Sequence, residues 1–125
     1  MSKILKSRAK KKGLPPGSLV HIGKEETSPI QLSLYRYSPT TFFCKNNASL
    51  EECLTPYRES EGIIWVNVDG IHDTRMIQKL GERFGVHPLV LEDIVNTDQR
   101  PKLEDHESYL YLVVKMLTFD LNRRE

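Results

Sequence analysis

Residues 73–94 predict two consecutive helices joined by a very short connection. Asp73 is a residue type that caps helix N-termini. Apolar residues follow it at helical spacing, namely Met76, Ile77, Leu80 and Phe84. Gly85 stands where a helix C-terminus favours glycine, and Pro88 stands in the first turn of the next helix. Such a helix pair must bury its apolar face against another layer of structure.

Strand patterns surround this helix pair. The apolar, β-branched run at residues 63–68 predicts a central strand covered on both sides. Residues 19–22 and 31–37 predict an earlier hairpin, and residues 102–105 and 109–119 predict two consecutive strands after the helices. The order of elements therefore predicts an α/β domain with a mixed β-sheet flanked by helices.

Two shorter helices are expected before the apolar strand. Ser38 and Pro39 form a helix start that leads through Phe42 and Phe43. Ser49, followed three residues later by Glu52, forms a capping-box pattern. The apolar face of this second helix is supplied by Leu50, Cys53 and Leu54.

Composition fits a single soluble domain. The chain has 125 residues, of which 38% are hydrophobic, and no apolar run approaches the roughly 20 residues of a membrane helix. Six basic residues and no acid lie within residues 1–12, whereas the rest of the chain has 12 basic and 17 acidic residues. We interpret residues 1–12 as a disordered, solvated basic tail and residues 13–125 as the domain. Contact of the tail with anionic lipid or nucleic acid is the alternative.

The two cysteines, Cys44 and Cys53, predict no disulfide framework and fit a reducing compartment. We expect both to be buried structural thiols. The chain contains no Gly-x-Gly-x-x-Gly, no P-loop and no Gly-x-Ser-x-Gly sequence. We therefore expect that the chain is not an enzyme.

Glu92 and Asp93 are adjacent acids on the second helix of the pair. Successive helix residues point about 100° apart, so both carboxylates cannot lie opposite the core. Two neighbouring carboxylates suit hard ions such as magnesium, and ordinary surface acids are the alternative interpretation.

Residues 85–102 resemble the signature of the cytoplasmic domain of the CorA family of divalent-cation transporters. They read Gly-Val-His-Pro-Leu-Val-Leu-Glu-Asp-Ile-Val-Asn-Thr-Asp-Gln-Arg-Pro-Lys. Residues 13–17, 65–72 and 109–117 resemble further blocks of the family in the same order. The resemblance implies an α/β/α sandwich in a homopentamer. It also implies a stalk helix and two membrane helices, which are not among these residues, so the domain is expected to be incomplete.

The resemblance also implies a metal site. Asp93 matches the family's aspartate that binds a regulatory divalent cation at the subunit interface, with a partner carboxylate beyond this chain. Glu92 matches a position associated with a second, weaker cation site. The implied ion is Mg²⁺, with Co²⁺ possible, both regulatory and transported, and the chain alone is not expected to hold it. The domain would be cytoplasmic, attached to the cell (inner) membrane through absent segments, with no nucleic-acid partner.

Two other functions remain open at this stage. A zinc-exporting relative of the same superfamily would share these blocks. A stand-alone soluble binding protein would use its basic tail on nucleic acid or membrane. We interpret three further residues structurally: His72 as helping to cap the Asp73 helix, His87 as a helix-to-helix corner, and Arg100 as pairing with an acid of the Glu92–Asp93 helix or of a neighbouring subunit. Trp65 is expected to serve packing.

Overall fold

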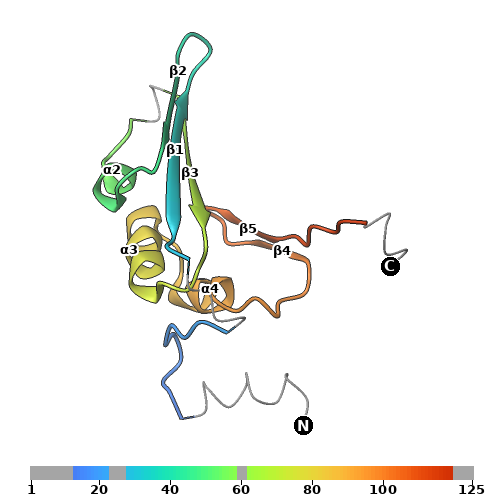
Figure 1. The fold of residues 1–125 in the computed structure, drawn as a ribbon. Coiled ribbons are helices and arrows are strands. Elements are labelled where there is room, and N and C mark those ends of the chain that lie inside the picture. The colour runs from blue at the N-terminus through green and yellow to red at the C-terminus, as the bar shows by residue number, and fades with distance from the viewer. Residues whose placement is uncertain (1–12, 23–27, 59–61, 120–125) are drawn as a thin grey trace.

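The computed structural model describes residues 13–22, 28–58 and 62–119, so the basic tail lies outside the described residues. Figure 1 shows the arrangement of the helices and strands. The elements in chain order are β1 (Gln31–Tyr37), β2 (Phe42–Asn46), α2 (Leu50–Leu54), β3 (Ile63–Asp69), α3 (Thr74–Phe84), α4 (Pro88–Ile94), β4 (Lys102–Asp105) and β5 (Leu110–Val113). Sheets and helices occur together, and the α/β fold class is confirmed.

The larger sheet has the strand order β2-β1-β3, with both pairs antiparallel. Side chains alternate along β1, so Leu32 and Leu34 are buried on one face. They form a core with Ala48, Cys53 and Leu80, which brings α2 and α3 onto that face (Figure 1). The expectation that residues 63–68 form the central strand is wrong, because β1 takes the middle position and β3 lies at an edge of this sheet.

The helix expected at residues 38–43 is also wrong. Ser38 Oγ accepts hydrogen bonds from the backbone N–H groups of Thr40 and Thr41, and Ser38 N–H donates to the Thr41 carbonyl. The capping hydroxyl therefore closes a turn between β1 and β2. Cys44, on the fully exposed strand β2, is exposed rather than buried, whereas Cys53 is buried as expected.

Residues 19–22 do not pair with β1. Ile22 N–H donates to the Val95 carbonyl at 3.0 Å, and Thr97 N–H donates to the Ile22 carbonyl at 2.9 Å. These bonds form one isolated parallel bridge between Ile22 and Asn96. The segment before β1 is thus fixed to the end of α4, and the expected hairpin with residues 31–37 is replaced by the β1–β2 hairpin.

The predicted start of α2 and both predicted ends of α3 are confirmed. Asp73 Oδ1 accepts hydrogen bonds from the N–H groups of Arg75 and Met76, each at 3.1 Å. Gly85 ends α3 with a left-handed φ of 68°. The capping box of Ser49 and Glu52 is present at the start of α2. Helices α3 and α4 meet around a second core of Ile77, Leu91 and Val95.

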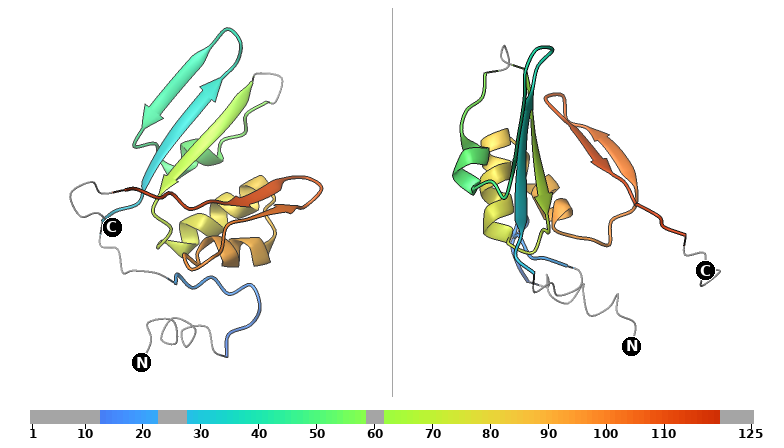
Figure 2. Two further views of the ribbon diagram at one scale, coloured as in Figure 1. Left: turned by 90° about the vertical axis from the view of Figure 1, so that its right-hand side faces the viewer. Right: turned by 45° about the horizontal axis from the view of Figure 1, so that its top comes forward.

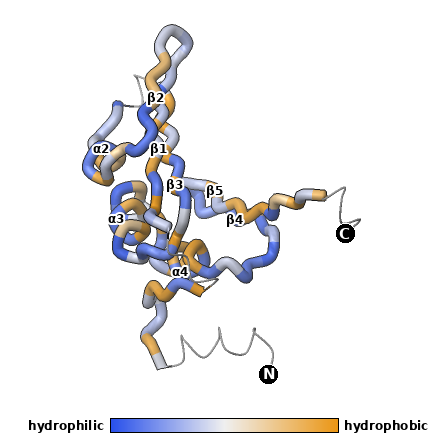
Figure 3. The backbone as a smooth tube through the Cα atoms, viewed as in Figure 1, coloured by the Kyte–Doolittle hydropathy of each residue, from blue (hydrophilic) through white to orange (hydrophobic). Residues whose placement is uncertain are grey.

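The β4–β5 hairpin forms a separate antiparallel pair. It lies on the side of the larger sheet opposite α2 and α3, and it diverges from that sheet (Figure 2). The strand expected at 109–119 ends at Val113, and residues 114–119 have no regular structure. This last segment is largely hydrophobic (Figure 3), and Met116 is 91% exposed.

Candidate metal site on α4

Helix α4 carries both acids that the sequence singled out. Pro88 lies at its first turn, and the ring Nδ1 of His87 accepts a hydrogen bond from Leu89 N–H, so the helix begins where the sequence predicts. Val90 and Leu91 are buried and fix the orientation of the helix. The next two residues, Glu92 and Asp93, are half-buried and bind different partners, as their angular separation predicts.

Both carboxylate oxygens of Asp93 have partners. Oδ2 lies 2.8 Å from Lys102 Nζ, and Oδ1 accepts a hydrogen bond from Gln99 Nε2 at 3.2 Å. The Asp93 side chain is still 37% exposed, so water or an ion can reach it. Asp93 is thus accessible, and its negative charge is already paired.

Lys102 lies between two carboxylates. Its Nζ is 2.8 Å from Asp93 Oδ2 and 2.7 Å from Glu104 Oε1. Hydrogen bonds to Asp93 and then to Glu104 raise the pKa of Lys102 well above its usual value. The ammonium group also lies 5.0 Å from the centre of the Tyr111 ring, within the range of a cation–π contact. Lys102 therefore remains charged throughout the physiological pH range.

Glu104 extends the series of charged groups into the β4–β5 hairpin. Its Oε2 lies 3.3 Å from Nε2 of His106, whose ring stacks on Tyr109 with centroids 4.9 Å apart. The hydrogen bond from Lys102, and to a smaller extent that from His106, lowers the pKa of Glu104. Charged and polar groups therefore connect α4 to the β4–β5 hairpin without a break.

A hollow of about 320 Å³ lies beside this chain of groups. It is lined by His87, Leu89, Val90, Asp93, Glu104 and His106. Within the described part of the chain, no three His, Cys, Asp or Glu side chains are placed to hold a metal ion together. The fit to a hard cation comes from two carboxylates, those of Asp93 and Glu104, which already converge on one positive group, the Lys102 ammonium.

Glu92 faces the amino-terminal segment. Its Oε2 accepts a hydrogen bond from Gly17 N–H at 3.0 Å, and Pro15 and Ser18 close a turn around that glycine. Gly17 has a φ of 84°, a conformation that glycine adopts without strain. The carboxylate of Glu92 thus anchors the turn at residues 15–18 to α4, and a cation at this position would share its oxygens with that anchor.

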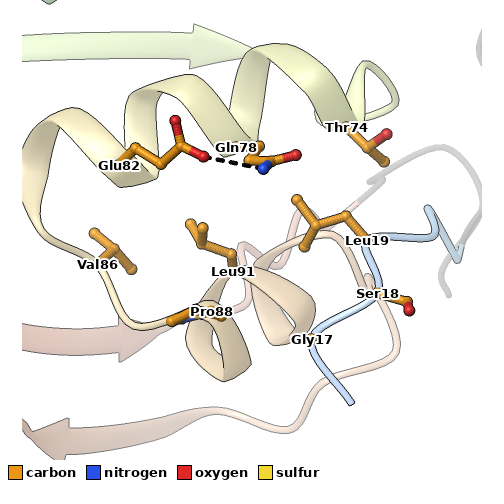
Figure 4. Close-up of a pocket in the computed structure, with 9 residues that line it drawn as sticks. All are labelled: Gly17, Ser18, Leu19, Thr74, Gln78, Glu82, Val86, Pro88 and Leu91. Atoms are coloured by element: carbon orange, nitrogen blue, oxygen red, sulfur yellow. Dashed lines mark hydrogen bonds between the residues drawn. The ribbon is translucent and has the colours of Figure 1, made fainter. Parts of the chain in front are cut away.

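A second hollow, of about 330 Å³, separates the amino-terminal segment from α3 and α4 (Figure 4). Leu19, Pro88 and Leu91 supply much of its apolar wall. Its carboxylate, Glu82, accepts a hydrogen bond from Gln78 Nε2 at 3.0 Å. Neither Asp93 nor Glu92 lines this hollow, so it is separate from the candidate metal site.

The structure also shows the contacts of the other residues that the sequence singled out. His87 forms the corner between α3 and α4, since its N–H also donates to Tyr109 Oη at 3.1 Å. The rings of His72 and His21 meet edge-on with their centroids 6.4 Å apart, while Asp73 accepts the capping hydrogen bonds of α3. Trp65 contacts Tyr35, although it is 57% exposed. The cation paired with Asp93 is Lys102, not Arg100.

Comparison with known families and proteins agrees with the resemblance. Residues 60–125 match the family described as CorA-like Mg²⁺ transporter protein. The chain is also 46% identical over 115 residues to the cobalt/magnesium transport protein CorA of Thermotoga maritima. That match covers 92% of this chain and 32% of the relative, so the chain spans about a third of the relative's length. Within the described ranges, no helix has the length and hydrophobicity to cross a membrane. The chain belongs to the family of CorA-like Mg²⁺ transporter proteins.

Proposed function

We propose that this chain is the cytoplasmic, divalent-cation-sensing part of a CorA-type magnesium/cobalt transporter. The family match and the similarity to a cobalt/magnesium transport protein support the class of transporter. The arrangement around Asp93 supports the sensing role, because an accessible carboxylate on a fixed helix is already directed at a cationic group. That arrangement is the observation that carries the proposal.

In this proposal, Asp93 supplies one ligand and a carboxylate of the neighbouring subunit supplies another. A Mg²⁺ ion between them holds the subunits of a homopentamer in a closed arrangement. When internal Mg²⁺ is scarce, the unbridged carboxylates repel each other, and the assembly populates conducting arrangements. The ion acts by binding one state more tightly than the other, which shifts the population between the states.

Glu92 has a lesser part in this mechanism. Its carboxylate already accepts the Gly17 N–H, so it supports a cation near α4 through its charge while it anchors the turn at residues 15–18. The Asp93 carboxylate has no such backbone contact among the described residues, and its partners are the side chains of Lys102 and Gln99. We therefore assign Asp93 the direct ligand role in the proposed sensor.

The test is Asp93→Asn in the full-length transporter, read out as protection from protease across a magnesium series. The substitution removes the charge and keeps the size of the side chain, so the fold is expected to persist. The Mg²⁺ concentration that gives half-maximal protection is expected to rise about tenfold, because one charged ligand is lost. Asp69→Asn, at the exposed end of β3, is the matched control and is expected to retain protection. Unchanged protection in Asp93→Asn would remove Asp93 from the sensor.

A further inference from the structure

Lys102 Nζ forms contacts with two carboxylates from different elements, Asp93 of α4 and Glu104 of β4. We propose, on the basis that Asp93 is the cation ligand proposed above, that Lys102 is a built-in competitor for the divalent cation. Its ammonium neutralises Asp93 when no metal ion is bound. When a metal ion binds Asp93, the ammonium moves fully onto Glu104. Lys102 thereby sets the cation concentration at which the sensor responds.

The charges around Lys102 favour this exchange. Asp93 and Glu104 contribute two negative charges against the single positive charge of Lys102, so the trio retains one negative charge that attracts a second cation. After a divalent ion binds Asp93, Lys102 still has Glu104 as a partner. Releasing Asp93 therefore leaves no buried, unpaired ammonium, which would otherwise make the release costly.

The side chain of Lys102 is suited to this movement. A lysine ammonium is a compact charge on a flexible stem, and this one is 26% exposed. Its distances to the two acceptors, 2.8 Å and 2.7 Å, are nearly equal. The Tyr111 ring, 5.0 Å from Nζ, gives the ammonium a further favourable contact on the hairpin side. Rotation of the stem toward Glu104 would free Oδ2 of Asp93 and keep the ammonium paired.

Competition of this kind lowers the apparent affinity of the site. When the binding-competent state of a protein is only partly populated, the apparent affinity for its ligand is reduced by the populated fraction. Here the competent state is the one in which Asp93 is free of Lys102. Replacing Lys102 by a neutral side chain is therefore expected to tighten cation binding, and replacing it by arginine is expected to leave the competition in place.

The test is a Mg²⁺ titration of the full-length transporter, read out as the Mg²⁺ concentration that gives half-maximal protection from protease. Wild type is compared with Lys102→Met, with Lys102→Arg and with Lys102→Met combined with Asp93→Asn. Lys45→Met is the matched control, because Lys45 pairs with Glu52 at a separate place and its loss changes the net charge equally. Asp93→Asn alone reports whether Asp93 binds the ion at all.

Lys102→Met is expected to bind Mg²⁺ about tenfold more tightly than wild type, as for removal of one charge-assisted hydrogen bond from the ligand. The gain is expected to vanish with Asp93→Asn and to be absent in Lys102→Arg and Lys45→Met. Equal affinity of Lys102→Met and wild type would overturn the role of Lys102. If Asp93→Asn still weakened binding while Lys102→Met and wild type bound equally, the proposed function of Asp93 would stand without a role for Lys102. A gain that persisted with Asp93→Asn, or that Lys45→Met reproduced, would also overturn it, since net charge would then be the cause.

Discussion

Nζ of Lys102 lies 2.8 Å from Oδ2 of Asp93, and this ion pair joins the first residue of β4 to the last turn of α4. The two residues are nine positions apart in sequence. The pair therefore has two consequences. It ties the β4–β5 hairpin to the helix pair, and it places a positive group on the carboxylate that the family resemblance assigns to a divalent cation.

The 125-residue chain is expected to bind Mg²⁺ weakly or not at all. Both oxygens of Asp93 already accept hydrogen bonds from Gln99 and Lys102, and the ion holds its water tightly. Isothermal titration calorimetry of wild type and Asp93→Ala checks this. Saturable binding at micromolar Mg²⁺, abolished by Asp93→Ala, would show that the chain contains a complete site and would contradict the prediction.

The parts of the fold that were predicted correctly depend on local chemistry. Asp73 caps α3, Gly85 ends it, and the Ser49–Glu52 capping box starts α2, because each signal acts within one helical turn. The helix predicted at Ser38 was wrong because a serine hydroxyl caps a turn as readily as a helix. Only the pairing of β2 with β1 decides between the two. The position of β1 in the middle of the sheet depends in the same way on long-range pairing.

The candidate site was predicted only in part, because local signals identify some of its residues and long-range folding positions the others. Asp93 and Glu92 follow from a motif on a single helix, and their different orientations follow from helix geometry. Lys102, Gln99 and Glu104 were not singled out, because their approach to Asp93 depends on how the hairpin folds back toward α4. Lys102 is the last residue of the stretch that resembles the family, and this was the feature of the sequence that pointed to it.

The pairing of Glu52 with Lys45 is expected to make stability depend on pH in the acid range. The hydrogen bond from Lys45, followed by that from the Ser49 backbone, lowers the pKa of Glu52 from 4.5 to about 2 in the folded chain. A depressed folded pKa stabilises the fold above pH 4.5, and this contribution is lost as pH falls from 4.5 toward 2. Urea unfolding across this range is expected to show a shallower pH dependence for Glu52→Gln than for wild type.

Glutamine at this position keeps the capping box, so the comparison isolates the charge. Lys45→Met removes the largest cause of the pKa change and is expected to flatten the same part of the profile. Added salt is expected to reduce the difference between wild type and both variants, because the pair is exposed to solvent. Identical profiles for wild type and Glu52→Gln would show that this pair does not contribute.

Gly81→Ala is expected to destabilise the chain although Gly81 lies inside α3. A methyl group there would overlap Cδ2 of Leu91 and lie 2.9 Å from its Cγ, and Leu91 is itself buried in the second core. Alanine favours helix by about 1 kcal/mol over glycine, whereas overpacking costs roughly 1–3 kcal/mol. We expect a net loss of up to about 2 kcal/mol in the free energy of unfolding, measured with urea.

Leu91→Ala provides the control for this contact. In that background the methyl group of Gly81→Ala has space, so the second substitution is expected to become neutral or stabilising. Additive effects of the two substitutions on the free energy of unfolding would show that overlap with Leu91 is not the cause of the loss in Gly81→Ala.

The chain is expected to associate with itself through the β4–β5 hairpin as concentration rises. Leu103, Leu110 and Leu112 are each more than 60% exposed, and the apolar segment after Val113 is exposed as well. In the described residues, β5 pairs only with β4, which leaves its other edge without a strand partner. An apolar strand with a free edge is a template for pairing with another chain, and Lys115 is the one charge in residues 110–119.

Light scattering of wild type over a concentration series is expected to show dimers or larger species. Leu112→Lys is expected to favour the monomer, because it adds a charge to the apolar face and keeps every backbone hydrogen bond donor. Val113→Pro removes one donor and is expected to weaken association through the edge itself. Tyr37→Lys, on the exposed end of β1, is the control for added charge and is expected to associate like wild type. If wild type remained monomeric at high concentration, the free edge of β5 would have to be covered within the chain, and its apolar surface would not drive association.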